Sequence, residues 1–317
     1  MKKNKHKLLT TSILFALATG IIYVINRLVF ATAVLKNLLK SSADNYYNWR
    51  FGKVYYKKKG HGSPVLLIHD LTVYSSAYEW NKVVNELAEA HTVYAIDLLG
   101  CGRSEKPRIT YTNYLYVQLI ADFIKNIIGE KTDVIASGYS GSFTVLASYT
   151  NPEFINKIVL INPPSLASLN KVPSKRSKLY KFILEFPIFG TLIYNIKTCQ
   201  SNIQLLFTEN YLYNPFSVTP EMVDTYYEAA HKSLSNSKFL LSSLVAGYTN
   251  NNITHALREI NQSVTILYCE GETDSEKIAE SYTTYNPAIE SCMLKHAKHL
   301  PQLEISEKFL EILNIYL

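Results

Sequence analysis

The sequence is poor in several residues and patterns, and each shortage excludes a class of protein. Its four cysteines (Cys101, Cys199, Cys269 and Cys292) show neither paired nor metal-ligand spacing, so they predict no disulfide framework and leave the redox compartment open. No basic stripe with interleaved aromatic residues points to nucleic acid. No histidine has partners at ligand spacing, so we expect no metal ion, and we expect no other cofactor. Internal repeats and low-complexity segments are also lacking.

Hydrophobic residues, in contrast, are plentiful. They make up 47% of the 317 residues, which is enough to bury a full core and argues against general disorder. The formal net charge of +6 is modest, and Lys2, Lys3, Lys5 and Lys7 supply much of it at the N-terminus. The length suits one large domain, or a domain with an insertion, together with an anchor.

Residues 8–25 form an apolar run directly after these lysines. As a helix the run would extend roughly 27 Å, which matches the hydrocarbon core of a bilayer. We therefore predict a membrane partner and a single-pass transmembrane anchor within residues 1–35. A cleaved signal peptide is the alternative, because Ala31-Thr32-Ala33 resembles a cleavage site. The N-terminal lysines favour an extracytoplasmic domain, although Arg27, Lys36 and Lys40 reduce the charge asymmetry.

The rest of the chain alternates between strand and helix patterns. A polar connector is expected over 36–46, and one domain over 47–317. A hairpin turning at Phe51-Gly52 comes first. Buried strands are then predicted at 65–68, 92–96, 133–136, 158–161 and 264–268, with helices between them. This order predicts a doubly wound, mostly parallel α/β sheet, whose ligands bind beyond the carboxyl ends of the strands. The Tyr-rich helical stretch over about 163–260 interrupts the alternation and is expected to be an inserted cap.

The stretch 133–142 predicts a strand, a tight turn and a helix. A serine on such a turn, with small residues two before and two after it, is typical of a nucleophile elbow. Ser140 fits this spacing, with Gly138 and Ser142 as the small residues. Centring the pattern on Ser137 or on Ser142 places the bulkier Tyr139 or Thr144 at a flanking position. The alternative role for Ser140 is an ordinary helix N-cap.

Four separated motifs make the chain from Trp49 onward resemble the α/β-hydrolase superfamily. They are Leu66-Leu67-Ile68-His69-Asp70, the segment Asp97 to Ser104, the elbow at Ser140, and the pair formed by Gly271-Glu272-Thr273-Asp274 and Ala297-Lys298-His299-Leu300-Pro301. Their order along the chain is the order nucleophile, acid, histidine of that family. The resemblance implies the α/β-hydrolase fold with an inserted helical cap.

The same resemblance implies a catalytic triad. Ser140 would be the nucleophile, His299 the base and Asp274 the acid, with His296 and Glu272 as the rival histidine and rival acid.

It further implies an oxyanion hole made of the backbone N–H groups of Leu71 and Gly141. Asp70 replaces the usual glycine of its loop, and its charge would be unfavourable there unless it points away. His69 and Asp97 would have structural roles.

These expectations lead to a membrane-anchored serine hydrolase that cleaves lipophilic ester or acyl substrates through an acyl-enzyme. A serine nucleophile argues against the epoxide-hydrolase and dehalogenase branches, which carry aspartate at that position. Thioesterases, peptidases, C–C bond hydrolases and acyltransferases stay open, because fold and triad do not fix the substrate. The alternative is a catalytically inactive scaffold that acts as a membrane-tethered binding protein. The sequence makes no prediction of oligomeric state.

Overall fold

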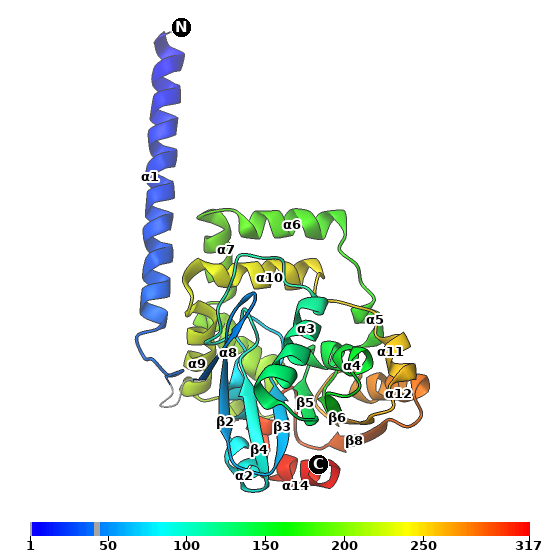
Figure 1. The fold of residues 1–317 in the computed structure, drawn as a ribbon. Helices are drawn as coiled ribbons and strands as arrows, with labels where there is room; N and C mark the ends of the chain where they lie inside the picture. The colour runs from blue at the N-terminus through cyan, green and yellow to red at the C-terminus, as the bar shows by residue number, and fades with distance from the viewer. Residues whose placement is uncertain (1, 41–44) are drawn as a thin grey trace.

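The computed structural model describes residues 2–40 and 45–317, so residues 41–44 of the expected connector lie outside the described residues. A long helix, α1 (Lys2–Ala33), projects from the domain in its N-terminal part, and its remaining part contacts the cap, from Phe15, whose ring centroid lies 6.1 Å from that of Phe189, to Phe30. The remainder of the chain forms a sheet flanked by helices (Figure 1).

The sheet has eight strands among the described residues, in the order β1-β2-β4-β3-β5-β6-β7-β8. The strands are β1 (Asn45–Trp49), β2 (Gly52–Lys59), β3 (Ser63–Ile68), β4 (His91–Ile96), β5 (Thr132–Ser137), β6 (Ile155–Ile161), β7 (Ser263–Cys269) and β8 (Glu290–Leu294). β1 and β2 form the expected antiparallel hairpin, and β2 pairs antiparallel with β4. All other neighbours are parallel. The predicted doubly wound, mostly parallel sheet is therefore confirmed.

Helices cover both faces of this sheet. One face packs against α3 (Asn113–Phe123), α4 (Ser140–Thr150), α11 (Thr254–Glu259) and α12 (Ser275–Tyr285) in the larger buried cluster. The other face packs against η1 (Ala77–Trp80), α2 (Val84–Ala90) and α14 (Ser306–Tyr316). Short elements η2 (Ile124–Ile128) and α13 (Pro301–Glu304) complete the layers. Strands buried on both sides explain the continuous apolar runs in the sequence.

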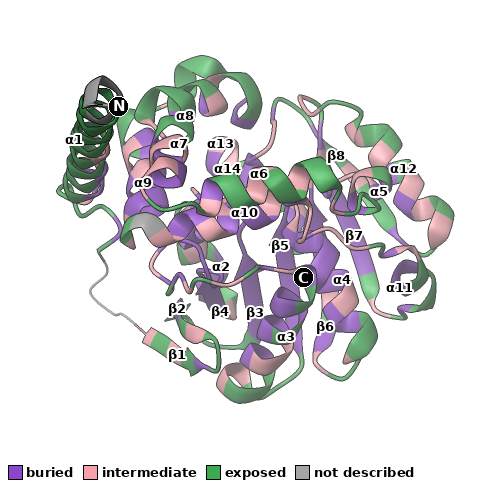
Figure 2. Ribbon diagram, turned by 90° about the horizontal axis from the view of Figure 1, so that it is seen from above, coloured by how far each residue is buried: buried purple, intermediate pink, exposed green. Residues whose placement is uncertain are grey.

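An all-helical cap lies between β6 and β7. It contains α5 (Leu166–Leu169), α6 (Lys175–Glu185), α7 (Phe189–Lys197), α8 (Gln200–Leu206), η3 (Phe207–Tyr211), η4 (Pro215–Ser217), α9 (Pro220–His231), η5 (Leu234–Asn236) and α10 (Ser237–Ala246). Figure 2 shows α6 and α10 crossing above the strands, with an exposed outer side on α6. A third buried cluster, including Phe207 and Tyr226, joins the cap to Leu300 and Leu303 of the main domain.

The C-terminal end of α1 packs against this cap. Phe30 is 3% exposed and its ring lies 6.4 Å from that of Tyr194 and 5.2 Å from that of His231. Asn26 donates a hydrogen bond to the Ile188 carbonyl (2.9 Å) and accepts one from Asn195 (2.9 Å). Residues 6–33 are long and apolar enough to cross a membrane, and their most apolar window is fully exposed. The lower end of α1 is thus fixed to the domain, while its N-terminal part projects from it.

Candidate active site

The turn between β5 and α4 lies two residues earlier than the sequence pattern predicts. β5 ends at Ser137, and α4 begins at Ser140. Between them Gly138 has a φ of 55°, the left-handed conformation expected at the apex of a strained strand-to-helix turn. The apex residue is therefore Gly138, and its small flanking residues are Ala136 and Ser140.

Ser140 consequently does not stand on the turn. It is fully buried at the first position of α4, and its Oγ donates a hydrogen bond to the His69 carbonyl at 2.5 Å. Among the described residues, no hydrogen bond joins this hydroxyl to His299. The structure thus has Gly138, and not Ser140, at the apex of the turn. The spacing fits both registers because small residues recur at every second position, at Ala136, Gly138, Ser140 and Ser142.

The carboxylate of Asp70 occupies the space that a side chain at the apex would need. A Cβ atom on Gly138 would lie 2.2 Å from Oδ1 of Asp70 and 2.9 Å from its Oδ2. Oδ1 accepts hydrogen bonds from the backbone N–H groups of Leu71 and Tyr139, each at 2.8 Å. A glycine at residue 138 is therefore required for Asp70 to adopt this position.

These two N–H groups form the geometry of an oxyanion hole. Leu71 was expected to contribute to it, and its N–H does lie at the site. Gly141 does not contribute, because its N–H donates to the Gly138 carbonyl within the first helical turn (3.1 Å). The N–H of Tyr139, directly after the apex, takes that place. The Asp70 charge was expected to be unfavourable here unless its side chain pointed away. The side chain instead points toward these two N–H groups, and its carboxylate accepts a hydrogen bond from each.

His299 lies between two carboxylates. Its Nε2 is 3.1 Å from Oδ2 of Asp70, and its Nδ1 is 2.9 Å from Oε1 of Glu272. Burial alone would lower the pKa of His299, but hydrogen bonds and charges from Asp70 and Glu272 outweigh it and raise the pKa to about 10. At neutral pH the ring is therefore an imidazolium that donates from both nitrogens.

The cap and the end of β6 hold this ring in place. The ring of Tyr211 stacks on the imidazole with centroids 4.9 Å apart and an interplanar angle of 14°. The side-chain amide of Asn162 donates to the carbonyls of Lys298 and His299, at 2.9 and 3.2 Å. The orientation of His299 is thus set from both sides before any ligand binds.

Asp274 is not the acid that contacts His299. Its carboxylate pairs with Lys277 at 2.9 Å, is 57% exposed, and starts α12 in a left-handed conformation. Glu272, the rival residue, takes the position at Nδ1 because the loop after β7 turns before Asp274 is reached. Of the two histidines, His299 is at the site, while the backbone N–H of His296 donates to Glu270 (3.0 Å).

His69 and Asp97 brace the loops around the site. His69 is fully buried, donates from Nδ1 to the Asp70 carbonyl (2.6 Å) and accepts at Nε2 from the Leu98 N–H (3.0 Å). Burial lowers its pKa, so the ring stays neutral. Burial alone would raise the pKa of Asp97, but two hydrogen bonds from the Arg103 side chain (2.7 and 2.8 Å) hold it below its usual value.

Glu79 is a buried carboxyl group on the far side of Asp70. It accepts from the Asp70 N–H (3.0 Å) and from the Tyr226 hydroxyl (3.2 Å). Burial and the neighbouring charge of Asp70 raise the pKa of Glu79 to about 8, so it is neutral at neutral pH. The negative charge of the site is therefore concentrated on Asp70 and Glu272, around one imidazolium.

A cavity of about 510 Å³ leads to this arrangement. Asp70, Leu71 and Tyr139 line it on the side of the sheet, and its other walls come from the cap, between residues 168–177 and 244–250. These walls carry hydroxyl, amide and apolar groups and one ammonium group, that of Lys171. In residues 2–40 and 45–317, no group of three or more His, Cys, Asp or Glu side chains could hold a metal ion.

Sequence reasoning therefore found the right loops and missed their central residues. Gly138 has no side chain, so its residue type does not indicate the position of a nucleophile. The available indication was Asp70: an aspartate in place of a loop glycine, opposite a turn whose apex is itself glycine. Together, an aspartate at residue 70 and a glycine at residue 138 indicate that the Asp70 carboxylate occupies the space of the missing side chain at the apex.

Comparisons with known proteins agree with this fold. The sequence profile of the alpha/beta hydrolase family matches residues 65–311. The chain is 29% identical over 110 residues to a soluble epoxide hydrolase of Corynebacterium sp. (strain C12), a stretch covering 35% of this chain and 38% of that one. It is 33% identical over 114 residues to a 2-hydroxy-6-oxo-6-(2'-aminophenyl)hexa-2,4-dienoic acid hydrolase of Metapseudomonas resinovorans, covering 35% and 39%. The matched stretches thus span little more than a third of these relatives.

One solved structure resembles the chain over nearly its full length. A membrane phospholipase A, described as a bacterial virulence factor, aligns with a TM-score of 0.67 at 18% identity, covering 98% of this chain and 97% of that one. At this identity the likeness is one of fold alone.

Proposed function

Because this chain belongs to the alpha/beta hydrolase family, we propose that it is a hydrolase whose nucleophile is the carboxylate of Asp70. The observation that carries the proposal is the position of that carboxylate. It fills the space above Gly138, with one oxygen on two backbone N–H groups and the other against His299. A nucleophilic carboxylate needs its two oxygens in different roles. One oxygen attacks the substrate, and the other carries the negative charge that develops when the ester is later hydrolysed.

The first step would form an ester on Asp70. Oδ2 attacks a saturated carbon of the substrate, the bond from that carbon to its oxygen breaks, and the oxygen takes the proton from the His299 imidazolium. His299 is then neutral. Esterification also removes the negative charge of Asp70, one of the two charges that raise the pKa of His299, so the ring becomes a competent base.

The second step would release the product. Neutral His299 removes a proton from water, and the resulting hydroxide attacks Cγ of the Asp70 ester. The N–H groups of Leu71 and Tyr139 stabilise the oxyanion that forms on Oδ1. The intermediate then expels the product oxygen, which takes the remaining proton of the attacking water. Asp70 returns as a carboxylate and His299 as an imidazolium, so the net reaction adds one water.

This chemistry favours strained cyclic ethers, epoxides above all, over the ester substrates expected from a serine nucleophile. A carboxylate that attacks an ester carbonyl is itself the better leaving group, so the intermediate reverts. A strained carbon–oxygen bond, in contrast, opens without that reversal. The resemblance of part of the chain to an epoxide hydrolase supports the same class, and the mixed walls of the cavity suit an apolar substrate with a polar end.

The membrane anchor is part of the proposal. Residues 6–33 supply an exposed apolar helix of sufficient length, for which a signal sequence is the alternative. The region of α6 supports an anchor, because Leu179 and Phe182 of this helix and Phe186 directly after it are 60%, 64% and 49% exposed. This helix lies on the side of the domain toward which α1 extends (Figure 1). Lys175, Arg176 and Lys178 accompany them on the same helix. Apolar side chains bordered by basic ones are typical of a helix lying on a membrane surface.

The test compares Asp70→Asn with Ser140→Ala in the full-length protein on a panel of apolar epoxides. Asp70→Asn keeps the shape of the side chain but removes the nucleophile, so turnover should fall roughly a thousandfold or more. Ser140→Ala removes one hydroxyl that bonds to a carbonyl, and should stay within about tenfold of wild type. Intact mass checks that the introduced amide is retained.

A single turnover in water labelled with heavy oxygen provides a second readout. The label should appear in the peptide that contains Asp70, because water attacks Cγ of the enzyme ester and not the substrate carbon. Turnover that survives Asp70→Asn but not Ser140→Ala would instead establish a serine mechanism. No turnover and no labelling of folded wild type, across epoxides and esters, would establish the binding scaffold.

A further inference from the structure

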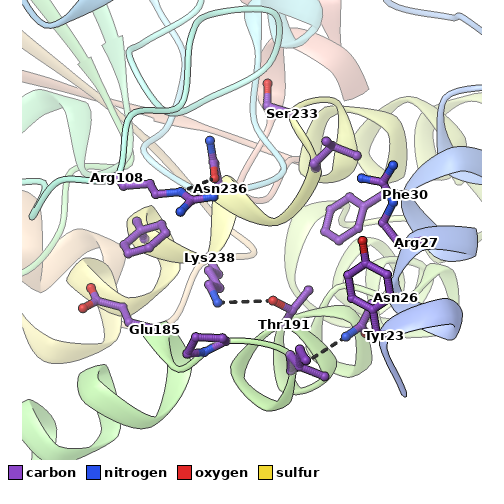
Figure 3. Close-up of a pocket in the computed structure, with 14 residues that line it drawn as sticks. Tyr23, Asn26, Arg27, Phe30, Arg108, Glu185, Thr191, Ser233, Asn236 and Lys238 are labelled. Atoms are coloured by element: carbon purple, nitrogen blue, oxygen red, sulfur yellow. Dashed lines mark hydrogen bonds between the residues drawn. The ribbon is translucent and has the colours of Figure 1, made fainter. Parts of the chain in front are cut away.

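A second cavity, of about 400 Å³, lies between the lower end of α1 and the cap (Figure 3). It shares no lining residue with the cavity at Asp70. Tyr23, Asn26, Arg27 and Phe30 of α1 form one side, and segments around Arg108, Thr191 and Lys238 form the other. The cavity therefore exists only because α1 packs against the cap.

The cavity is lined by an excess of positive charge. Arg27, Arg108 and Lys238 face it against a single carboxylate, Glu185. That carboxylate is already engaged, since its Oε1 pairs with Lys181 and accepts from the Ser242 hydroxyl (2.7 Å). None of the three cations has an ion pair with a carboxylate among the described residues. The cavity thus has an excess of positive charge, which an anionic ligand would neutralise.

Lys238 is the most deeply buried of these three cations. It is 4% exposed, and its Nζ donates to the Phe186 carbonyl (3.0 Å) and to the Thr191 hydroxyl (3.2 Å), so one of its three N–H bonds is left over. Burial, and to a lesser extent Arg108, lowers the pKa of Lys238 to about 8. The charge of Glu185 offsets this effect only in part. A buried cation whose hydrogen-bond partners are all neutral is costly, and an anion in the cavity would offset that cost.

An apolar groove continues from the cavity along α1. Its volume is about 290 Å³, and it is lined by Val24, Leu28 and Ala31 together with Tyr23, Arg27 and Leu234, which also line the cavity. The ligand suited to both spaces has an anionic head and an apolar chain. Arg27 lies directly after the apolar run of α1, at the depth where a membrane-embedded helix would meet lipid head groups.

We propose that this cavity and groove bind one anionic phospholipid, with the phosphate among Arg27, Arg108 and Lys238 and an acyl chain along α1. Such a lipid would hold α1 against the cap and so fix the domain relative to the membrane. Guanidinium groups suit this role because they bind phosphate through paired hydrogen bonds. The inference is independent of the reaction at Asp70.

The experiment titrates full-length protein in neutral detergent with phosphatidylglycerol, and in parallel with phosphatidylcholine of the same chains, counting bound lipid by native mass spectrometry. One phosphatidylglycerol should bind per chain, at least about tenfold more tightly than phosphatidylcholine. Arg108→Gln and Arg27→Gln, both at exposed positions, should each weaken it about tenfold, the loss expected for one charged hydrogen bond. Lys125→Gln, an exposed cation on η2, is the matched control and should leave binding unchanged.

Equal binding of the two lipids, or unchanged affinity in Arg108→Gln, would overturn the proposal. A third arm adds millimolar inorganic phosphate alone. Displacement of phosphatidylglycerol by phosphate would show a site for a free anion and would also overturn it, whereas retention of the lipid supports it.

Discussion

At the scale of single residues, Asp70 and Gly138 act as one unit. The carboxylate of Asp70 can bind the N–H groups of Leu71 and Tyr139 only because residue 138 has no side chain. The left-handed φ of 55° adds a second reason for glycine at that position, since other residues are strained there. A side chain at residue 138 would therefore collide with Asp70 unless Asp70 were also replaced.

Substitution at these two positions should therefore be strongly non-additive. Gly138→Ser alone should destabilise the fold by about 2–4 kcal/mol, from backbone strain and from the contact with Asp70. In the double variant with Asp70→Gly the contact is gone, so the loss should be about 1–3 kcal/mol smaller than the sum of the two single losses. Urea unfolding of the four proteins measures this coupling. Simple additivity would show that the two side chains do not compete for the same space.

The charge of His299 should be visible directly. Its ring should remain an imidazolium up to about pH 10 in the wild type, and Asp70→Asn should lower that pKa because one of the two partner charges is lost. Because the folded pKa is raised, the stabilisation is fully present below about pH 6.5 and is lost as pH rises toward 10. Nitrogen NMR of labelled imidazole follows the titration. An ordinary histidine pKa in the wild type would rule out the paired carboxylates.

The limit of sequence reasoning is clearest at this scale. His299, Leu71, His69 and Asp97 were placed in the right loops, because motif order along the chain is a robust property. The identity of the apex residue and of the acid depended on where β5 and β7 end, and a shift of two residues moved both assignments. Backbone conformation, and not residue type, decides such positions.

At the scale of elements, the parallel strands were predictable because each is an apolar run bounded by turn residues. The cap was recognised only as a break in that alternation, since its short helices pack by tertiary contact and not by a strong period of their own. The sequence does not show that the apolar side chains of α6 are exposed. The structure shows this, and it shows α6 on the side of the domain toward which α1 extends.

If α6 lies on a bilayer, a spin label at Phe182→Cys should report it. In full-length protein in lipid nanodiscs, with Cys199 and Cys292 replaced, the label should collide more with lipid-dissolved oxygen than with a water-soluble nickel complex. The control label at Lys125→Cys, on η2, should show the opposite preference. Matching profiles at the two positions would exclude membrane contact by α6.

At the scale of the whole molecule, α1 has two parts with different partners. Its upper part is exposed, whereas Asn26 and Phe30 are 4% and 3% exposed against the cap. This helix is thus joined to the domain by packing and hydrogen bonds as well as by the chain itself.

Two truncations of α1 should separate these parts. Removal of residues 1–22 should lower the free energy of unfolding by about 1 kcal/mol or less, because it removes the contact of Phe15 with Phe189 but leaves Asn26 and Phe30 in place. Removal through Ala33 should cost about 3–5 kcal/mol, from the lost burial of Phe30 and the lost hydrogen bonds of Asn26. Chemical unfolding in the same detergent compares the two. Equal losses would show that the contact with the cap contributes nothing.

The absence of a side chain at the apex residue Gly138 also has a consequence for covalent inhibitors. Organophosphates and sulfonyl fluorides inactivate by modifying an exposed, activated hydroxyl, and here the hydroxyl of Ser140 is buried and bonded to a carbonyl. An inventory of active enzymes based on such reagents would score this chain as inert. If Asp70 is the nucleophile, as we propose, carbodiimides or epoxide-bearing inactivators, which modify carboxylates, are the reagents that would label it.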